Sequence, residues 1–141
     1  MKHARAIAMA IGLAAAAFTG AASAGPGQDA IIAAWADKAK AADPAFSGFD
    51  AAAGKAFFFA KHTGGGAETP SCTSCHTDNI KKSGQTRAGK AIDPMAVSVQ
   101  ADRYTDLAKV EKWIGRNCNS VLGRDCTAKE AGDVISWLAS Q

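Results

Sequence analysis

The stretch SCTSCHTD, from Ser71 to Asp78, places two cysteines three positions apart and a histidine directly after the second. Cys-x-x-Cys-His is the attachment signature of c-type haem. In that chemistry the thiols of Cys72 and Cys75 each add across one vinyl group of the porphyrin. The next side chain, His76, then lies beneath the iron and donates a ring nitrogen as the proximal ligand. The sequence therefore predicts one covalently attached haem c.

Two other uses of such a cysteine pair fit the sequence less well. A thioredoxin-like redox pair needs a βαβ context, and no segment of the chain alternates like a strand. A zinc site could recruit Cys118 and Cys126, but zinc sites more often use a second closely spaced pair. Seven residues separate Cys118 from Cys126. The haem interpretation is therefore favoured over both.

The N-terminus has the layout of a secretory signal peptide. Two basic residues, Lys2 and Arg5, precede an apolar run over residues 6–18, and a small-residue pattern ends at Ala24. The run is shorter than the ~20 residues that a bilayer crossing needs. We therefore predict that residues 1–24 are a signal peptide, that the product is periplasmic, and that no membrane span remains after cleavage.

Cleavage after residue 24 of 141 would leave 117 residues, a length that suits one domain. Subtracting the two basic residues of the leader from 16 leaves 14 Lys and Arg against 13 Asp and Glu, a formal charge of +1. No basic block remains that would favour nucleic acid as a partner. We expect a monomer with an N-terminal extension helix in residues 25–48 and a monohaem cytochrome c domain in residues 49–141.

Hydrophobic periodicity predicts an all-α fold. Thr127 and Glu130 form a capping box, and apolar residues then follow at helical spacing to Leu138. Gly84, Gly89 and Pro94 interrupt regular structure, so we expect the segment 77–102 to be irregular. So few large apolar residues make a thin core, to which a buried haem would add apolar mass. Three further helices are expected, over residues 29–42, 50–62 and 105–115.

The residue opposite His76 decides the function, because two strong ligands make an electron shuttle and a weak sixth ligand leaves room for a small molecule. His62 precedes Cys72 by ten residues, and Met95 follows His76 by 19. Either would give an ordinary low-spin carrier, His/His or His/Met. In common small class I cytochromes, however, the ligand methionine comes later, in the loop before the last helix. That region contains Asn117, whose usual role at a helix end is a C-cap.

Cys118 and Cys126 are left over once the haem motif is assigned. In an exported chain, a disulfide that closes CNSVLGRDC is the favoured interpretation. Free thiols or a redox-active pair stay open as alternatives.

Several segments together resemble the Sphaeroides haem protein family of small, high-spin, monohaem class I cytochromes c. They are PSCTSCH, SGQTRAGK, DRYTD, KVEKWIGRNCNSVLGRDCT and the final WLAS, in that order from about Gly54 to Gln141. The resemblance implies a class I cytochrome c-like fold around one haem. It also implies that Asn117 is the sixth ligand of the ferric iron and that Cys118 and Cys126 form a disulfide.

The resemblance further implies a function that depends on the redox state. An amide oxygen is a hard, neutral, weak donor, which holds ferric iron better than ferrous iron. Asn117 would therefore leave the iron on reduction, and O2, NO or CO could bind to the ferrous haem. Family members accept electrons within a periplasmic redox chain, so we expect a dihaem cytochrome c as redox partner. Oxygen reduction is a further activity that such a haem could support.

Surface residues supply two weaker expectations. Lys81, Lys82 and Lys90 could form part of a docking surface near the haem edge, although solvated lysines are the simpler interpretation. Arg87 and Arg124 could pair with the haem propionates, because a guanidinium matches a carboxylate in a planar, bidentate way.

Overall fold

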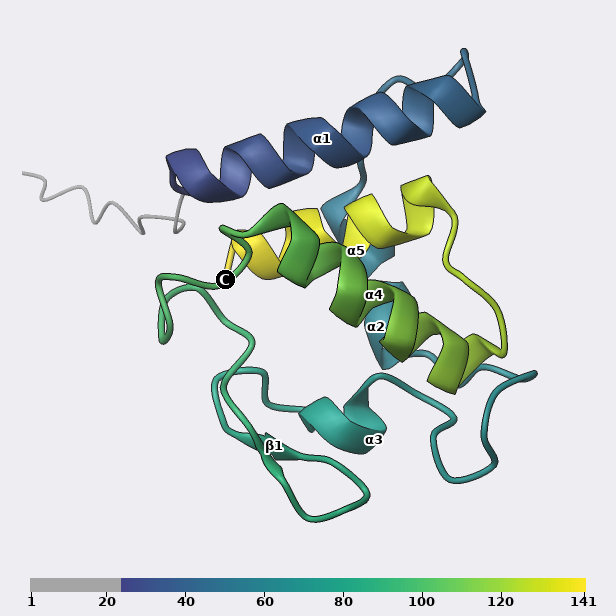
Figure 1. Cartoon of the computed structure of the whole chain (residues 1–141), viewed down its shortest axis with the longest axis vertical. Coiled ribbons are helices and arrows are strands. Elements are labelled where there is room, and N and C mark those ends of the chain that lie inside the picture. Colours follow the sequence, from purple (N-terminus) through teal and green to yellow (C-terminus); the bar gives the residue numbers. More distant parts are fainter. Residues whose placement is uncertain (1–23) are drawn as a thin grey trace, which may run out of the picture.

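The computed structural model describes residues 24–141, so the expected leader lies almost wholly outside the described residues. The described chain is mostly helical, as the sequence predicts (Figure 1). The helix α1 lies along one end of the molecule, and α3 with the β1 hairpin lies at the opposite end. The elements are, in order, α1 (Pro26–Ala42), α2 (Ala51–Phe59), α3 (Thr73–His76), β1 (Gly84–Gln85), β2 (Ala91–Ile92), α4 (Leu107–Leu122) and α5 (Ala128–Ala139).

The C-terminal helix α5 is the centre of the fold, and both α1 and α2 pack against it. Its contact with α2 is unusually close because Gly54 lies directly against the backbone of Asp133. An added Cβ at residue 54 would collide with the Asp133 carbonyl group. One turn further along α2, Phe58 packs on Trp137 with the ring centroids 5.2 Å apart. Glycine is therefore needed here for the two backbones to approach each other.

The core has two main clusters, and α5 contributes residues to both. Phe58, Val134 and Trp137 belong to the first, and Met95 packs at its edge. Residues of α1 join α4 and α5 in the second, whose buried members are Ile31, Trp35, Val110, Ala131 and Ile135.

The helix α4 extends further than its sequence predicts. We expected it to end at Gly115, but it continues to Leu122 and stops at Gly123, whose φ of 69° is left-handed. Cys118, Val121 and Leu122 form a small buried cluster that continues the apolar face beyond the polar stretch. Asn117 is therefore a residue of the helix and not its C-cap. Gly115 is tolerated inside it because burial of that face outweighs a cost of about 1 kcal/mol.

Other element boundaries shift in smaller ways. The helix α2 ends at Phe59, so His62 lies in the following loop. The segment expected to be irregular contains a short antiparallel ladder in which Gly84 pairs with Ile92. Within residues 24–141, no helix is long and apolar enough to cross a membrane.

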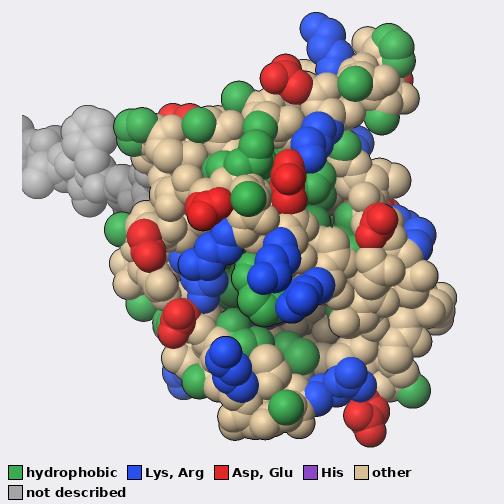
Figure 2. Space-filling model, in the orientation of Figure 1, with side chains coloured by type: hydrophobic (Ala, Val, Ile, Leu, Met, Phe, Trp, Pro, Cys, Tyr) green, Lys and Arg blue, Asp and Glu red, His purple; other side chains and the backbone are tan. Residues whose placement is uncertain are grey.

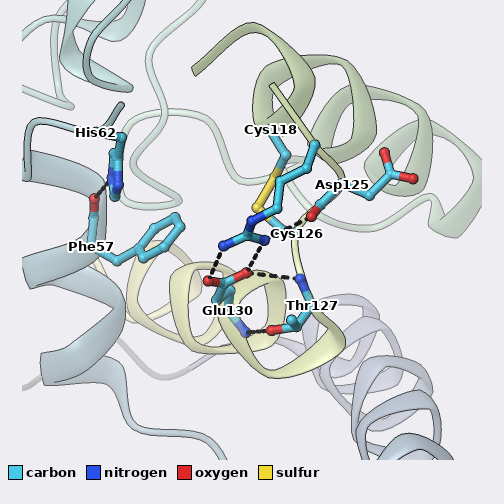
Figure 3. Close-up of polar contacts among 8 residues, drawn as sticks. Phe57, His62, Cys118, Asp125, Cys126, Thr127 and Glu130 are labelled. Atoms are coloured by element: carbon cyan, nitrogen blue, oxygen red, sulfur yellow. Dashed lines mark hydrogen bonds and ion pairs between the residues drawn. A yellow bond between two sulfur atoms is a disulfide. The ribbon is translucent and has the colours of Figure 1, made fainter. Parts of the chain in front are cut away.

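The N-terminus of α5 is held by an ion pair as well as by the expected capping box (Figure 3). The Thr127 hydroxyl accepts from the Glu130 backbone N–H, and the Glu130 carboxylate accepts from the Thr127 N–H at 2.8 Å. The Arg124 guanidinium donates to both carboxylate oxygens of Glu130, at 2.8 Å each. This pairing, more than the capping bond, lowers the pKa of Glu130 to about 2.

We predict that Glu130→Gln destabilises the haem-loaded protein by about 1 kcal/mol at neutral pH, the typical value of a helix cap. The pKa of Glu130 is lower in the folded than in the unfolded chain. Its contribution to the free energy of unfolding is therefore full above pH 4.5 and is lost as the pH falls toward about 2. Urea denaturation of both proteins across this range should show their stabilities converging in acid. Glu68→Gln, at an exposed residue, should match the wild type throughout. A Glu130→Gln defect of constant size at every pH would contradict the assignment.

We also predict that Gly54→Ala lowers the free energy of unfolding by about 2–3 kcal/mol, because the new methyl group separates α2 from α5. Thermal unfolding followed by circular dichroism would measure the loss. Gly115→Ala is the matched control, since a Cβ at Gly115 meets nothing within 4 Å. That change should stabilise the protein by about 0.5–1 kcal/mol. Equal effects of both substitutions would rule out the close contact as the cause.

Candidate haem site

The cysteine pair and His76 lie on a single short helical turn. The backbone N–H groups of Cys75 and His76 both donate to the Cys72 carbonyl, at 3.3 and 3.1 Å. The turn ends at Thr77, which has a positive φ of 62°. Gly84 lies against the Cys75 carbonyl so closely that no side chain would fit between them. The β1 hairpin thus supports the turn, which carries two free thiols beside one imidazole.

The His76 ring is buried and neutral. Its exposed fraction is 8%, and its Nδ1 atom has no hydrogen-bond partner among the described residues. Burial, and secondarily the positive charge of Arg103, lower the pKa of His76 to about 4. The imidazole is therefore unprotonated at neutral pH, which is the form that binds a metal.

Asn117 of α4 lies next to the same ring. Its side-chain Nδ2 atom lies 3.4 Å from His76 Nε2, although the two residues are 41 positions apart along the chain. The distance is long for a hydrogen bond, so it indicates two polar groups directed at one point. The structure thus brings together His76 and Asn117, two of the residues proposed from the sequence.

A cavity between α2, α4 and α5 contains these groups. Most of its wall is aliphatic or aromatic, and the polar side chains are few. Its lining includes Cys72, His76, Met95, Asn117, Cys118 and Glu130. Such a lining, apolar with a few polar groups pointing inward, is typical of a ligand or cofactor site.

Met95 lies in the wall of this cavity and its backbone is fixed from two sides. The Tyr104 hydroxyl donates to the Met95 carbonyl at 2.9 Å, and Arg103 Nε donates to the Pro94 carbonyl at 2.8 Å. The Met95 N–H donates to the Ile80 carbonyl at 2.8 Å. Met95 is therefore close enough to the site to remain a candidate, while the side chain found opposite His76 is Asn117.

His62 lies elsewhere. Its ring packs on Phe57 with the centroids 4.6 Å apart, and its Nε2 atom is 2.9 Å from the Phe57 carbonyl oxygen (Figure 3). It is not among the residues that line the cavity. This placement does not favour His62 as the residue opposite His76.

A disulfide joins Cys118 and Cys126, with the two Cα atoms 5.5 Å apart (Figure 3). It connects α4, one residue after Asn117, to the segment that enters α5. Both cysteines are consequently unable to bind zinc together with Cys72 and Cys75. No group of three or more His, Cys, Asp or Glu side chains that could hold a metal ion occurs within residues 24–141.

The arginine whose charge reaches His76 is one that sequence reasoning missed. Arg124 is engaged by Glu130, and Arg87 lies 4.0 Å from Glu68 with both side chains largely exposed. Neither arginine lines the cavity. Arg103, in contrast, is half-buried and lowers the pKa of His76 by its charge. The only sequence signal was its place in DRYTD, since spacing does not reveal a neighbour 27 positions away.

The residues present fit a covalently attached haem. Two free cysteines precede a neutral, buried imidazole in the chain, and the Nε2 atom of that imidazole lies beside Asn117 in a mainly apolar cavity. Burial raises the pKa of the Cys72 thiol to about 11, so Cys72 is not a ready thiolate ligand for a bare metal ion. A thioether link to a porphyrin has no need of a thiolate in the final state.

Comparison with known proteins agrees with this chemistry. Residues 44–138 match the family described as "Domain of unknown function (DUF1924)". The chain is 56% identical over 92 residues to the cytochrome c-type protein SHP of Cereibacter sphaeroides, covering 65% of this chain and 71% of that protein. It is 35% identical over 104 residues to cytochrome c'' of Methylophilus methylotrophus, covering 73% and 72%.

Solved structures of these relatives share the fold. A structure of oxidised SHP, described as an oxygen-binding cytochrome c, matches with a TM-score of 0.74 and 48% identity over 81% of this chain and 96% of that one. A solution structure of cytochrome c'', described as giving insight into haem-ligand detachment, matches with a TM-score of 0.65 and 32% identity, covering 81% and 93%. The expected class I cytochrome c-like fold is thereby confirmed. The chain belongs to the family of c-type cytochromes that includes SHP and cytochrome c'', and it carries covalently attached haem c.

Proposed function

We propose that this protein is a periplasmic, high-spin monohaem cytochrome that accepts electrons and binds a small diatomic ligand, O2, NO or CO, at the ferrous haem. Asn117 would act as a gate that opens on reduction. The observation that carries the proposal is the 3.4 Å approach of the Asn117 amide to His76 Nε2 within one apolar cavity.

The roles of the residues follow from their positions. Cys72 and Cys75 would hold the haem through thioether bonds, His76 would be the proximal ligand and Asn117 the distal ligand in the ferric state. When bound, the haem supplies an iron that changes between two oxidation states and accepts a sixth ligand. The neutral state of the buried His76 ring suits it to its role at physiological pH.

The chemistry of the amide group is the basis of the gate. A carbonyl oxygen is a hard donor without charge, so ferric iron retains it better than ferrous iron does. Within residues 24–141, the Asn117 amide makes no hydrogen bond beyond the long approach to His76 Nε2. A side-chain rotation is therefore sufficient for its departure.

The surroundings of Asn117 would keep this motion local. The disulfide starts at the next residue and ties α4 to the start of α5. The Arg124–Glu130 pair closes the same segment from outside. With the segment directly after Asn117 fixed in this way, release of the ligand would not require α4 to unfold.

The descriptions of two related structures support the proposal. The solved SHP is described as oxygen-binding, and the cytochrome c'' structure concerns haem-ligand detachment. Leader-like residues 1–24 favour export to the periplasm. A dihaem cytochrome c is the electron donor that we propose.

A second candidate function is a low-spin His/Met electron carrier. It rests on the position of Met95 in the wall of the same cavity as His76. The two functions differ in spin state and in access of small molecules to the iron, which allows a direct test.

We predict that Asn117→Ala changes the ferric optical spectrum and accelerates binding of NO to the ferric haem at least tenfold, because the wild-type residue would cover the iron in that state. Without the Asn117 amide, the sixth position of the iron has no competing protein ligand. The incoming molecule can then bind without waiting for that ligand to leave. Stopped-flow spectroscopy of ferric protein with NO would measure this, and the rate of CO binding to the ferrous protein should stay at the wild-type value, because Asn117 would already have left the reduced iron. Asn119→Ala is the matched control, since Asn119 is exposed on the same helix and outside the cavity wall. An unchanged ferric spectrum and an unchanged rate of NO binding for Asn117→Ala would refute the gate.

We further predict that Met95→Ala leaves the ferric spectrum in its wild-type form while reducing stability by about 2–3 kcal/mol through lost packing. Magnetic circular dichroism of both oxidation states, together with urea denaturation, would separate the two effects. A low-spin wild-type protein that becomes high-spin in Met95→Ala would establish the second candidate function instead.

A further inference from the structure

The outer face of α4 carries a row of basic side chains around one exposed tryptophan. Lys109, Lys112, Trp113 and Arg116 follow at i, i+3, i+4 and i+7, so they share one side of the helix. All four are exposed, and Trp113 has 48% of its surface accessible. We call these four residues the α4 basic stripe. Figure 2 shows Lys and Arg side chains gathered where α4 crosses this face, with hydrophobic side chains between them.

The charges of the stripe are available to a partner. Among the described residues, the recorded ion pairs involve none of Lys109, Lys112 and Arg116. Lys112 Nζ and the Arg116 guanidinium instead lie over the Trp113 ring, 5.8 and 5.4 Å from its centroid. This arrangement keeps the cations beside an exposed apolar surface.

The opposite face of the same helix lines the haem cavity. Ile114, Asn117, Cys118 and Val121 all contribute to its wall. Arg116 directly precedes Asn117, and Trp113 lies one turn before it. A protein docked on the stripe would therefore be separated from the haem site by a single helix.

We propose that the α4 basic stripe is the docking surface for the electron-donating protein, and that this donor presents an acidic patch to it. The inference rests on the proposed electron-accepting function and adds the surface. Tryptophan and arginine are the residues that most often dominate binding energy at protein interfaces, and complementary charge raises the association rate. The formal charge of residues 25–141 is only +1, so three cations on one face of α4 form a local positive patch and do not reflect a generally basic surface.

An acidic protein fits the stripe better than a membrane or a second copy does. The row is short, about 10 Å from Lys109 to Arg116 at 1.5 Å per residue, and it has one apolar anchor. An amphipathic membrane-binding helix would need a broad apolar face in the same direction. A second copy would bring the same positive charges into opposition.

The chain offers an internal control for the test. Lys81 and Lys82 line an open hollow beside Asp78 and Trp137 that shares no residue with the haem cavity wall. Lys109→Glu with Lys112→Glu can therefore be compared with Lys81→Glu with Lys82→Glu, which changes the net charge equally. Trp113→Ala is matched by Leu107→Ala, another exposed apolar residue of α4. Arg116 is left intact because it adjoins Asn117.

The experiment is stopped-flow reduction of each ferric haem-loaded variant by a reduced acidic dihaem cytochrome c at low ionic strength. We expect the stripe double variant to react at least tenfold more slowly and the Lys81/Lys82 variant within twofold of the wild type. The difference should vanish in about 1 M salt, where the Debye length is about 3 Å. Trp113→Ala should weaken binding of the oxidised donor, measured by titration calorimetry, at least tenfold more than Leu107→Ala.

Several results would overturn the proposal. One is equal rates for the two double variants, another a larger loss for the Lys81/Lys82 variant, and a third an absence of donor binding by the wild type. Stripe variants that lose only binding to phosphatidylserine vesicles, or that only convert a dimer to a monomer in sedimentation, would assign the surface to another occupant. Reduction by dithionite followed by CO binding should be unchanged in every variant. A failure of that control reaction in the wild type would count against the proposed gas binding and not against the docking surface, which calorimetry tests separately.

Discussion

The close contact of α2 with α5 is the constraint on which the rest of the structure depends. Because Gly54 has no side chain, its backbone meets that of Asp133, and the two helices cross with little space between them. The same approach brings Phe58 against Trp137, and Phe58 in turn lies 6.1 Å from the His76 ring, centroid to centroid. The turn that carries the haem attachment residues is thus supported by the main helix contact. The same side chain, Phe58, therefore belongs to the core and supports the His76 ring.

The second determinant is the double use of α4. Its inner face supplies Asn117 and much of the cavity wall, and its outer face carries cations that are not neutralised by the recorded ion pairs of the described chain. The disulfide and the Arg124–Glu130 ion pair connect the C-terminal part of α4 and the segment after it to the start of α5. In the proposed mechanism, a rigid helix would lie between the docking surface and the ligand position, and the motion of one side chain would control access to the iron.

The polar groups of the site lie in apolar surroundings, which determine their protonation states. The buried His76 ring stays neutral because burial and the Arg103 charge both oppose protonation. Arg103 also fixes the chain beside Met95 through the Pro94 carbonyl, while the buried Tyr104 hydroxyl holds the Met95 carbonyl itself. Burial raises the Tyr104 pKa, so this donor keeps its proton over the whole physiological range. These contacts hold a potential sulfur ligand in the cavity wall while an amide group faces the imidazole.

The amino-acid sequence by itself determined the haem motif, the all-α class, the capping box of α5 and the residues of the disulfide, because each depends on neighbours a few positions apart or on a pattern with a known chemical meaning. The haem ligand candidates were also visible as residue types. The family resemblance pointed to Asn117 among them, and the tertiary structure showed where each lies: His62 packs on Phe57, Met95 lies in the cavity wall, and Asn117 lies beside His76, 41 positions away in the chain. The true end of α4 and the role of Arg103 were likewise settled only in three dimensions. Burial of Cys118, Val121 and Leu122 outweighed the local helix-breaking signal of Gly115, and no sequence period records the energy of contacts between distant segments.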